Sequence, residues 1–315
     1  MTDSLGSIGT YIKDVIYYRG HILYCVKNTN NLYVKYPSRN TIFKFDGCFG
    51  SSEDKSIYLY EDSSYYYVYT LAISALNLTI KQVKFTKTNG NMSSSKPTIT
   101  TYTGTLSSGD TLYNSEFYVY NDYAYISILN GSTYYVKKLN LSSSITISNL
   151  YSSSNPFYIK PDIFDLSHFY VLNATSVKKI NADGSLQSTT SLPYTISTTG
   201  FIDYFNNYVV YTTNGLIFYI TNLVTNKTNM IVCEDDIPLL DSSNIRTLKI
   251  KKITNKGELQ FYLGLTKGQH IKFYSDTTSF VRLDYSFIEP HNKIVFKIVA
   301  DPYKNTEDIL IVYDS

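Results

Sequence analysis

Short runs of alternating apolar and polar residues recur along the chain, and a polar turn interrupts each pair of runs. The stretch EFYVYNDYAYISILNG, residues 116–131, shows this most clearly, because two aromatic runs flank the polar pair Asn121-Asp122. Alternation with period two predicts a β-strand with one buried face. Two such runs around a short polar break predict a β-hairpin.

Six further stretches share this pattern of run, turn and run. They begin at Asp14, Ser56, Asp162, Gly200, Thr247 and Ser286. Counted from the second residue of each stretch, the seven units are 42, 60, 46, 38, 47 and 39 residues apart. Most of these intervals match the roughly 40 to 50 residues of a four-stranded propeller blade. The spacing therefore predicts a repeat protein.

Turn signals occur where a second hairpin in each unit requires them. They are Asp46-Gly47, Asn89-Gly90, Asn130-Gly131, Asp183-Gly184, Asn214-Gly215 and Lys256-Gly257. Asn-Gly and Asp-Gly pairs supply the positive φ angles of tight hairpin turns. Each unit then has about four strands, which predicts an all-β fold, a β-propeller of six or seven four-stranded blades.

The chain ends and the longest interval refine this prediction. The last run, residues 307–315, leaves the final unit short, and the run at 7–15 precedes the first hairpin, so pairing of the N- and C-terminal strands is expected to close the ring. Residues 88–110 are rich in Gly, Ser and Thr, which predicts an inserted loop. We expect one domain, residues 1–315. A pair of β-sandwiches joined at 150–161 is the alternative, and a β-helix would need shorter repeats.

Composition supports strands and limits the partners. The chain has 33 Tyr, 16 Phe and no Trp, and only 17% of its residues are charged. Its net charge is +2, and the basic run at 245–256 alternates as a strand with one wet face, so we expect no nucleic-acid partner. We see no secretory signal peptide and no apolar run of about 18 residues, so we expect no direct insertion into a membrane.

Motifs for metal, cofactor or catalytic chemistry are missing from the sequence. Cys25, Cys48 and Cys233 form no CxxC pair, and the four histidines have no metal-ligand spacing. No GxSxG, GxxxxGK[ST], HExxH or GxGxxG sequence occurs. We therefore expect no metal, no cofactor and no enzymatic activity.

Three carboxylates form the best case for an enzyme. Asp165, Asp203 and Glu289 each follow the start of a unit by the same number of residues. Equivalent positions of a propeller surround one axis, so these groups would converge as the acid and nucleophile of a glycosidase do. Each also lies just before a predicted turn, where Asp accepts hydrogen bonds from local amides, and we favour this structural role. Three of the other units carry Tyr17, Leu59 and Val119 at this position.

Tyrosine is the residue most suited to recognition in this chain. In SSYYYVYT, residues 63–70, Tyr65 and Tyr67 share one face of a strand and Tyr66 takes the other. Exposed tyrosine offers a large, stiff and amphipathic contact. We predict that Tyr65, Tyr66, Tyr67 and Tyr102 bind a partner, with the loop at 88–110 as a contact.

One tetrapeptide and the overall composition resemble known families. YITN, residues 219–222, resembles the YVTN-type repeats of archaeal surface-layer propellers, whereas the lack of Trp and of Gly-Gly pairs excludes WD, complete sialidase and kelch motifs. The Tyr, Ser, Thr and Asn content is similar to that of virion proteins of viruses that infect hot-acid archaea and of phage tail components.

This resemblance implies a non-enzymatic structural or attachment protein in a virion or tail. It would act as a rigid disc that binds other particle proteins, or a protein or glycan of a host surface. A carbohydrate-active propeller enzyme and a cellular scaffold propeller are the alternatives. The expected location is the virion, with the cytoplasm or the cell surface as alternatives.

Overall fold

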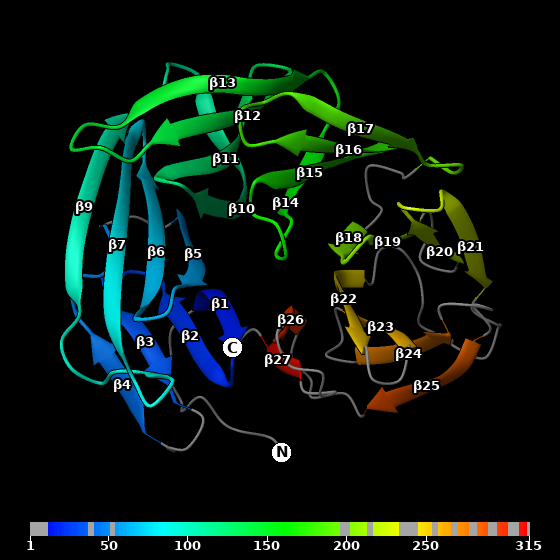
Figure 1. Cartoon of the computed structure of the whole chain (residues 1–315), viewed down its shortest axis with the longest axis horizontal. Helices are drawn as coiled ribbons and strands as arrows, with labels where there is room; N and C mark the ends of the chain where they lie inside the picture. The colour runs from blue at the N-terminus through cyan, green and yellow to red at the C-terminus, as the bar shows by residue number, and fades with distance from the viewer. Residues whose placement is uncertain are drawn as a thin grey trace. The chain divides into compact units, whose positions relative to one another are not determined.

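The computed structural model of the chain is built of β-strands joined by turns (Figure 1). The structure describes residues 12–36, 41–50, 54–195, 202–212, 217–232, 245–253, 258–265, 270–276, 282–288, 295–301 and 309–313. Within these ranges there is no helix, and hence none long and apolar enough to cross a membrane. The prediction of an all-β fold is confirmed.

The chain divides into two compact units, residues 1–154 with residue 315, and residues 155–314. The division falls inside the stretch 150–161 that would join two β-sandwiches. Strands occupy most of that stretch, however, and each unit is a succession of sheets rather than a sandwich of two. The single domain stays a prediction.

The first unit contains three sheets whose strands follow chain order. The first sheet has β1 (Ile12–Tyr18), β2 (His21–Val26), β3 (Leu32–Lys35) and β4 (Ile42–Phe45). The second has β5 (Asp54–Glu61), β6 (Tyr65–Ser74), β7 (Asn77–Thr88), β8 (Asn91–Met92) and β9 (Thr98–Thr105), and both β8 and β9 pair with β7. The third has β10 (Asp110–Tyr120), β11 (Tyr123–Asn130), β12 (Thr133–Asn140) and β13 (Thr146–Ser153).

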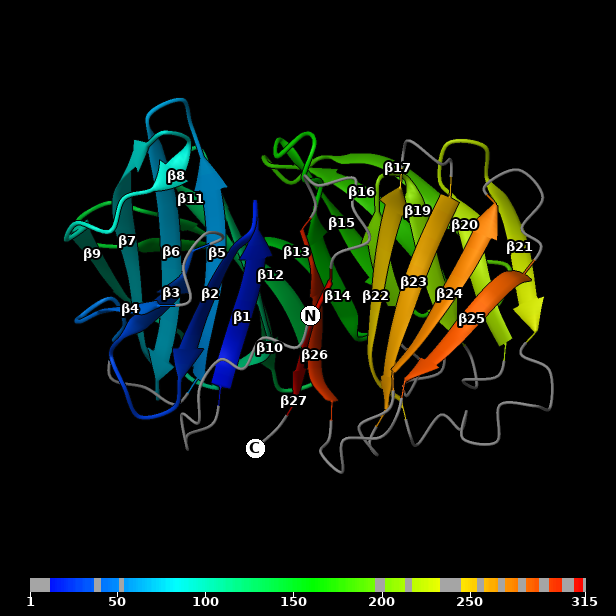
Figure 2. The ribbon, with the colours of Figure 1, turned by 90° about the horizontal axis from the view of Figure 1, so that it is seen from below.

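The second unit continues the same antiparallel meander, seen for β22 to β25 in Figure 2. Its first two sheets have β14 (Phe157–Pro161), β15 (His168–Asn173), β16 (Ser176–Asn181) and β17 (Leu186–Ser191), and then β18 (Ile202–Phe205), β19 (Tyr208–Thr212), β20 (Ile217–Asn222) and β21 (Lys227–Val232). The next has β22 (Ile245–Ile253), β23 (Glu258–Leu265), β24 (His270–Asp276) and β25 (Arg282–Ile288), and the last has β26 (Val295–Ala300) and β27 (Ile309–Tyr313).

Five of the seven predicted hairpins are confirmed. They are β1–β2, β5–β6, β10–β11, β18–β19 and β22–β23. The hairpin predicted from Asp162 is displaced, because its first strand is β14, which ends at Pro161. The hairpin predicted from Ser286 is wrong, since β25 pairs with β24 and β26 pairs with β27. A period-two run shows that a strand forms, but it does not show which strand becomes its neighbour.

The inserted loop predicted at 88–110 is also wrong. Thr98–Thr105 form β9, which pairs with β7 without interruption. Most side chains of β9 are exposed, and many of them are threonines, so the strand lacks a clear alternation of apolar and polar residues. Its composition therefore resembles that of a loop. The ring closure was predicted to use the N-terminal run at residues 7–15. Ile12–Val15 of this run belong to β1, and residues 1–11 lie outside the described residues. The described residues contain six sheets of four or five strands and one of two; blade number and closure stay predictions.

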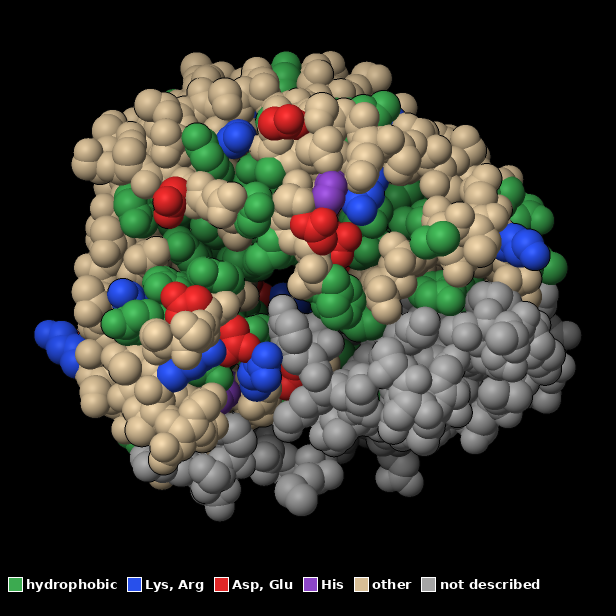
Figure 3. All heavy atoms as spheres, viewed as in Figure 1, with side chains coloured by type: hydrophobic (Ala, Val, Ile, Leu, Met, Phe, Trp, Pro, Cys, Tyr) green, Lys and Arg blue, Asp and Glu red, His purple; other side chains and the backbone are tan. Residues whose placement is uncertain are grey.

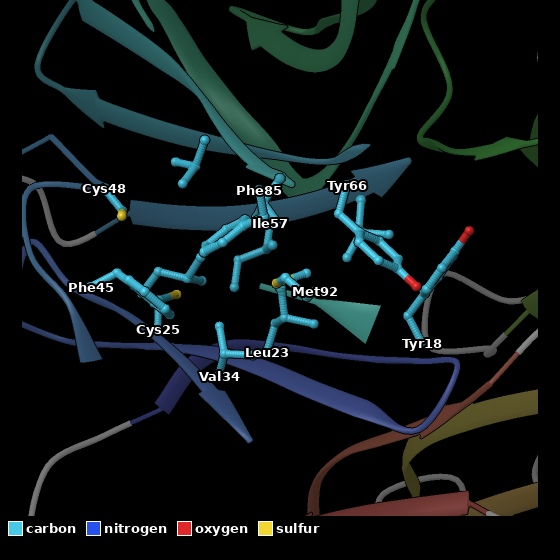
Figure 4. Packing of buried hydrophobic residues seen from close by; sticks show 14 of the residues in the cluster. Tyr18, Leu23, Cys25, Val34, Phe45, Cys48, Ile57, Tyr66, Phe85 and Met92 are labelled. Atoms are coloured by element: carbon cyan, nitrogen blue, oxygen red, sulfur yellow. The ribbon is translucent and has the colours of Figure 1, made fainter. Parts of the chain in front are cut away.

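The core lies between successive sheets. Buried side chains from the first and second sheets interlock in the cluster of Figure 4, which includes Leu23, Phe45, Tyr66 and Phe85. Similar clusters fill the space between the second and third sheets and between the sheets of β14–β17 and β18–β21. Central strands are therefore buried on both faces, as all six residues of β2 are. First strands are neighbours within a unit: β5 contacts β1 and β10, and β22 contacts β18 and β26.

Candidate functional site

The turn between β5 and β6 organises the tyrosines that the sequence singled out. Asp62 fixes this turn, because its Oδ1 accepts hydrogen bonds from the backbone N–H groups of Ser64 and Tyr65, both at 2.7 Å. Its Oδ2 accepts a third from the hydroxyl of Tyr67 at 2.8 Å. An aspartate followed by two serines favours such a turn, since its carboxylate satisfies amides that have no partner in the sheet.

Three tyrosines form a continuous aromatic surface beside this turn. Tyr60 and Tyr67 are cross-strand partners whose rings stack with centroids 5.2 Å apart and 19° between their planes. Tyr65 lies 6.0 Å from Tyr67 in a tilted arrangement. Tyr60 is 36% exposed, and the other two are partly exposed. We call Tyr60, Tyr65 and Tyr67 the tyrosine cluster.

A lysine lies over the tyrosine cluster. The ammonium group of Lys84 lies 3.7 Å from the ring centroid of Tyr65 and 5.7 Å from that of Tyr67, within range of a cation–π interaction. On the opposite face of the sheet, where Glu61 pairs with Tyr66, Glu61 bridges two cations, with Arg19 Nε at 2.5 Å and Lys87 Nζ at 2.6 Å. The contact with Lys84 and the stacking between the rings restrict the positions of Tyr65 and Tyr67.

The electrostatics keep Tyr60 and Tyr67 neutral and Asp62 charged at physiological pH. Burial, and then the hydrogen bond to Asp62, raise the pKa of Tyr67 to about 12. Burial and the negative charges of Asp62 and Asp122 raise the pKa of Tyr60. Burial opposes ionisation of Asp62, but the hydrogen bonds that it accepts outweigh this effect and lower its pKa. Tyr60 and Tyr67 therefore offer hydroxyl groups and apolar rings, and do not act as bases.

Of the four predicted binding tyrosines, Tyr66 is placed differently from the rest. It is fully buried beneath the turn, where its hydroxyl donates to the carbonyl of Gly90 at 2.7 Å (Figure 4). The odd and even residues of β6 face opposite ways, so Tyr66 belongs to the core between the first and second sheets, whereas Tyr67 is partly buried against the core between the second and third. Tyr102 lies on β9, partly buried against the core between the second and third sheets and remote in sequence from the cluster.

The two described carboxylates of the enzyme hypothesis have separate structural roles. Asp165 lies in the turn between β14 and β15 and accepts a hydrogen bond from the Ser167 amide at 3.1 Å. Asp203 is 1% exposed in the middle of β18, with Lys160 Nζ 3.4 Å from its Oδ1. Glu289 lies outside the described residues. The predicted common position of Asp165 and Asp203 is wrong because one residue follows a strand and the other lies within one.

Asp165, Ser167 and His168 include the three residue types of a catalytic triad but not its geometry. Asp165 Oδ2 and Ser167 Oγ lie 2.9 and 3.0 Å from the same nitrogen, His168 Nδ1. A catalytic histidine uses one ring nitrogen for the acid and the other for the serine. Here the Ser167 hydroxyl also bonds Asp165, so the three groups satisfy one another within the turn.

Metal-ligating and charged side chains are spread out on the part of the surface that the structure describes. No group of three or more His, Cys, Asp or Glu residues in the described ranges is placed to hold a metal ion. Figure 3 shows that uncharged side chains cover most of the visible described surface and that charged ones are scattered over it.

The sequence identified part of this site. It indicated Tyr65 and Tyr67 from their shared face, but it missed Tyr60, Asp62 and Lys84. Tyr60 could have been found from the hairpin register, because a two-residue turn at Ser63-Ser64 pairs Asp62 with Tyr65 and so places Tyr60 opposite Tyr67. Lys84 comes from β7, which pairs with β6, and its place over Tyr65 depends on the register between those strands.

Comparisons with known proteins identify the fold and no family. The sequence matches no protein-family model and no curated protein. Among solved structures, the WD40 β-propeller domain of Doa1 is similar, with a TM-score of 0.55, 10% identity, and coverage of 97% of this chain and 90% of that one. The C-terminal WD40 domain of Sif2 is also similar, with a TM-score of 0.52, 10% identity, and coverage of 98% and 80%. Identities this low establish likeness of fold alone, which supports a β-propeller repeat protein.

Proposed function

We propose that the chain is a non-enzymatic scaffold that binds another protein through the tyrosine cluster. The observation that carries this proposal is the fixed, partly exposed aromatic surface of Tyr60, Tyr65 and Tyr67. Tyrosine is enriched at binding hot spots because a ring with two rotatable bonds loses little conformational entropy on binding. Stacking within the cluster and the cation of Lys84 reduce this loss further.

The fold likeness and the carboxylates favour this scaffold over the alternatives. A propeller of six or seven blades, closed by its terminal strands, would give the cluster a rigid support. The glycosidase alternative loses its basis in the described residues, since Asp165 is bonded within its own turn and Asp203 is paired with Lys160. A role in a virion or in host attachment has no support in the fold likeness, and the virion location stays a prediction.

The test compares partners recovered by the wild-type chain and by a double variant, Tyr60→Ala with Tyr67→Ala. Each tagged protein is expressed in its source, purified natively and examined by quantitative mass spectrometry. Tyr158→Ala is the matched control, because Tyr158 is 37% exposed but lies on β14. We expect one or more stoichiometric partners with the wild type and the control, and at least tenfold less with the double variant.

Two results would contradict the proposal. Equal recovery of every partner by the double variant would show that the tyrosine cluster is not the contact. Recovery of each protein as a free monomer would remove the scaffold function itself. Recovery together with capsid or tail proteins would restore the virion hypothesis.

A further inference from the structure

The outer edge of β9 differs from the other sheet edges in the described residues. Strands at an edge carry unpaired backbone groups, and proteins normally protect them with charged residues or β-bulges. Among the last strands of the sheets, β4, β21 and β25 contain Lys or Arg, whereas β13, β17, β25 and β27 have register shifts in their pairing. The sequence of β9, TITTYTGT, has no charge and no proline, and its eight pairs with β7 are regular.

Two backbone hydrogen bonds show which groups of β9 point away from β7. The N–H of Leu106 donates to the carbonyl of Leu76 at 2.8 Å, so even-numbered residues of this strand face β7. The N–H of Ile145 donates to the outward carbonyl of Thr103 at 2.9 Å. Because direction alternates along a strand, Ile99 and Thr101 also turn their N–H and C=O groups outward.

Part of this edge is already paired by the chain itself. Thr103 forms a parallel bridge with Ser144, and a Cβ placed on Gly104 would lie only 2.9 Å from Ile145 Cβ. The segment before β13 therefore covers the end of β9, and the backbone from Thr98 to Tyr102 continues beyond it. This contact shows that an outward carbonyl of β9 can pair with the backbone of another segment.

The two faces of β9 border two hydrophobic cores. Ile99 packs against the cluster between the first and second sheets, and Tyr102 against the cluster between the second and third. Side chains of a strand added beyond β9 would alternate in the same way, and so each would extend one of these cores. Such a strand gains both backbone hydrogen bonds and apolar burial.

We propose that the edge of β9 at residues 98–102 binds an extended segment of a partner protein, uncharged and with β-branched or aromatic side chains, by adding a strand to this sheet. The outward groups of Ile99 and Thr101 supply the hydrogen bonds, and alternate side chains of the segment supply specificity. The absence of charge on β9 favours an uncharged segment over an acidic or basic one. This inference rests on the proposed scaffold function but uses a surface other than the tyrosine cluster.

The test uses a library of random twelve-residue peptides displayed on phage and panned against the full chain. Soluble Thr101→Pro protein is present as a competitor, so that peptides for other surfaces are removed. Proline at Thr101 removes an outward N–H and no bond to β7, and proline is tolerated at such edge positions. Enriched peptides are then synthesised, and their affinities are measured by fluorescence anisotropy.

We expect uncharged peptides with β-branched or aromatic residues at alternate positions. They should bind Thr101→Pro at least tenfold more weakly than the wild type, and backbone N-methylation of the peptide should have a similar effect. Thr101→Lys provides a second blocking variant if the proline variant does not fold. Thr189→Pro is the matched control on another edge strand, β17. The hydrogen bond from Leu192 N to Thr175 O shows that the Thr189 N–H points away from β16. The Thr189→Pro protein should bind the peptides as tightly as the wild type does.

Peptides that bind all variants equally, or that are insensitive to N-methylation, would overturn the inference. A panning that enriches no peptide would also overturn it. If light scattering shows a dimer of the chain that Thr101→Pro dissociates, the occupant is a second copy, and the proposed partner segment is wrong. Because Tyr60 and Tyr67 are unchanged throughout, failure here leaves the test of the tyrosine cluster intact.

Discussion

The turns β5–β6 and β14–β15 join the first and second strands of their sheets, yet they present different surfaces. In the first, Asp62 orders the turn and the flanking residues Tyr60, Tyr65 and Tyr67 form an aromatic surface. In the second, Asp165 orders the turn, and Ser167 and His168 both contact its carboxylate.

In both turns an aspartate carboxylate accepts a hydrogen bond from the amide two residues later. The difference arises from the neighbouring side chains. Tyr67 bonds Asp62 through its hydroxyl while its ring stays in the aromatic surface, whereas Ser167 and His168 bond Asp165 and add no aromatic surface of this kind. The turn after the first strand of a sheet can therefore carry an aromatic surface or only a local network of polar groups.

The largest expected effect is a loss of stability on removing a buried aromatic ring, which both hairpins have. The second residue of β6, Tyr66, and the second residue of β15, Phe169, are both fully buried. We expect Tyr66→Ala and Phe169→Ala each to lower the free energy of unfolding by about 3–5 kcal/mol, since each leaves a cavity. Tyr65→Ala, at the surface, should cost less than about 1 kcal/mol. Denaturant unfolding followed by circular dichroism measures these changes; similar values for Tyr65→Ala and Tyr66→Ala would contradict the assignment of faces.

A smaller effect should separate the two aspartates. Asp62→Ala removes three hydrogen bonds to a carboxylate, one of them from Tyr67, and we expect a loss of about 2 kcal/mol. Asp165 is 53% exposed, so Asp165→Ala should cost about 1 kcal/mol or less. The unfolding free energies of the two variants test this order. The reverse order would show that the first turn is held by its strands and not by Asp62.

The smallest effect is a difference in pH dependence. Hydrogen bonds, the one from Ser167 Oγ foremost, lower the pKa of Asp165, and those that Asp62 accepts lower its pKa despite burial. The stability that each contributes is present above the ordinary pKa of 3.8 and is lost as pH falls through the lowered value. Both turns should therefore loosen in acid, which nuclear magnetic resonance of the Ser64 and Ser167 amides would detect.

The first turn should also respond in alkali. The pKa of Tyr67 is raised from its ordinary value of 10.0 to about 12, so its contribution is complete below the ordinary value and is lost as pH rises through about 12. The tyrosinate absorbance of the wild type minus that of Tyr67→Phe should titrate near this pH. A midpoint at the ordinary value would show that neither burial nor the hydrogen bond to Asp62 acts on this hydroxyl.

Prediction from sequence succeeded where local chemistry decides the outcome. Asn89-Gly90 has φ angles of 51° and 76°, as its predicted tight turn requires, and period-two runs located β5–β6 and β10–β11. It failed for β9, whose Thr-rich sequence is stable as a strand because β7 supplies its partner. It also failed for the predicted hairpin from Ser286, where two adjacent runs belong to different sheets.

The sequence by itself determined that the chain forms antiparallel hairpins, and it placed Tyr65 and Tyr67 on the face opposite Tyr66, because side-chain direction alternates along any strand. Only the tertiary structure decided how far each face is buried, since packing of the first sheet on the second covers Tyr66 completely, whereas Tyr67 on the other face is only partly buried against the third sheet. It also decided that Asp165 and Asp203 have separate roles. Alternation is a property of the backbone, whereas burial and proximity depend on the residues that other strands bring near.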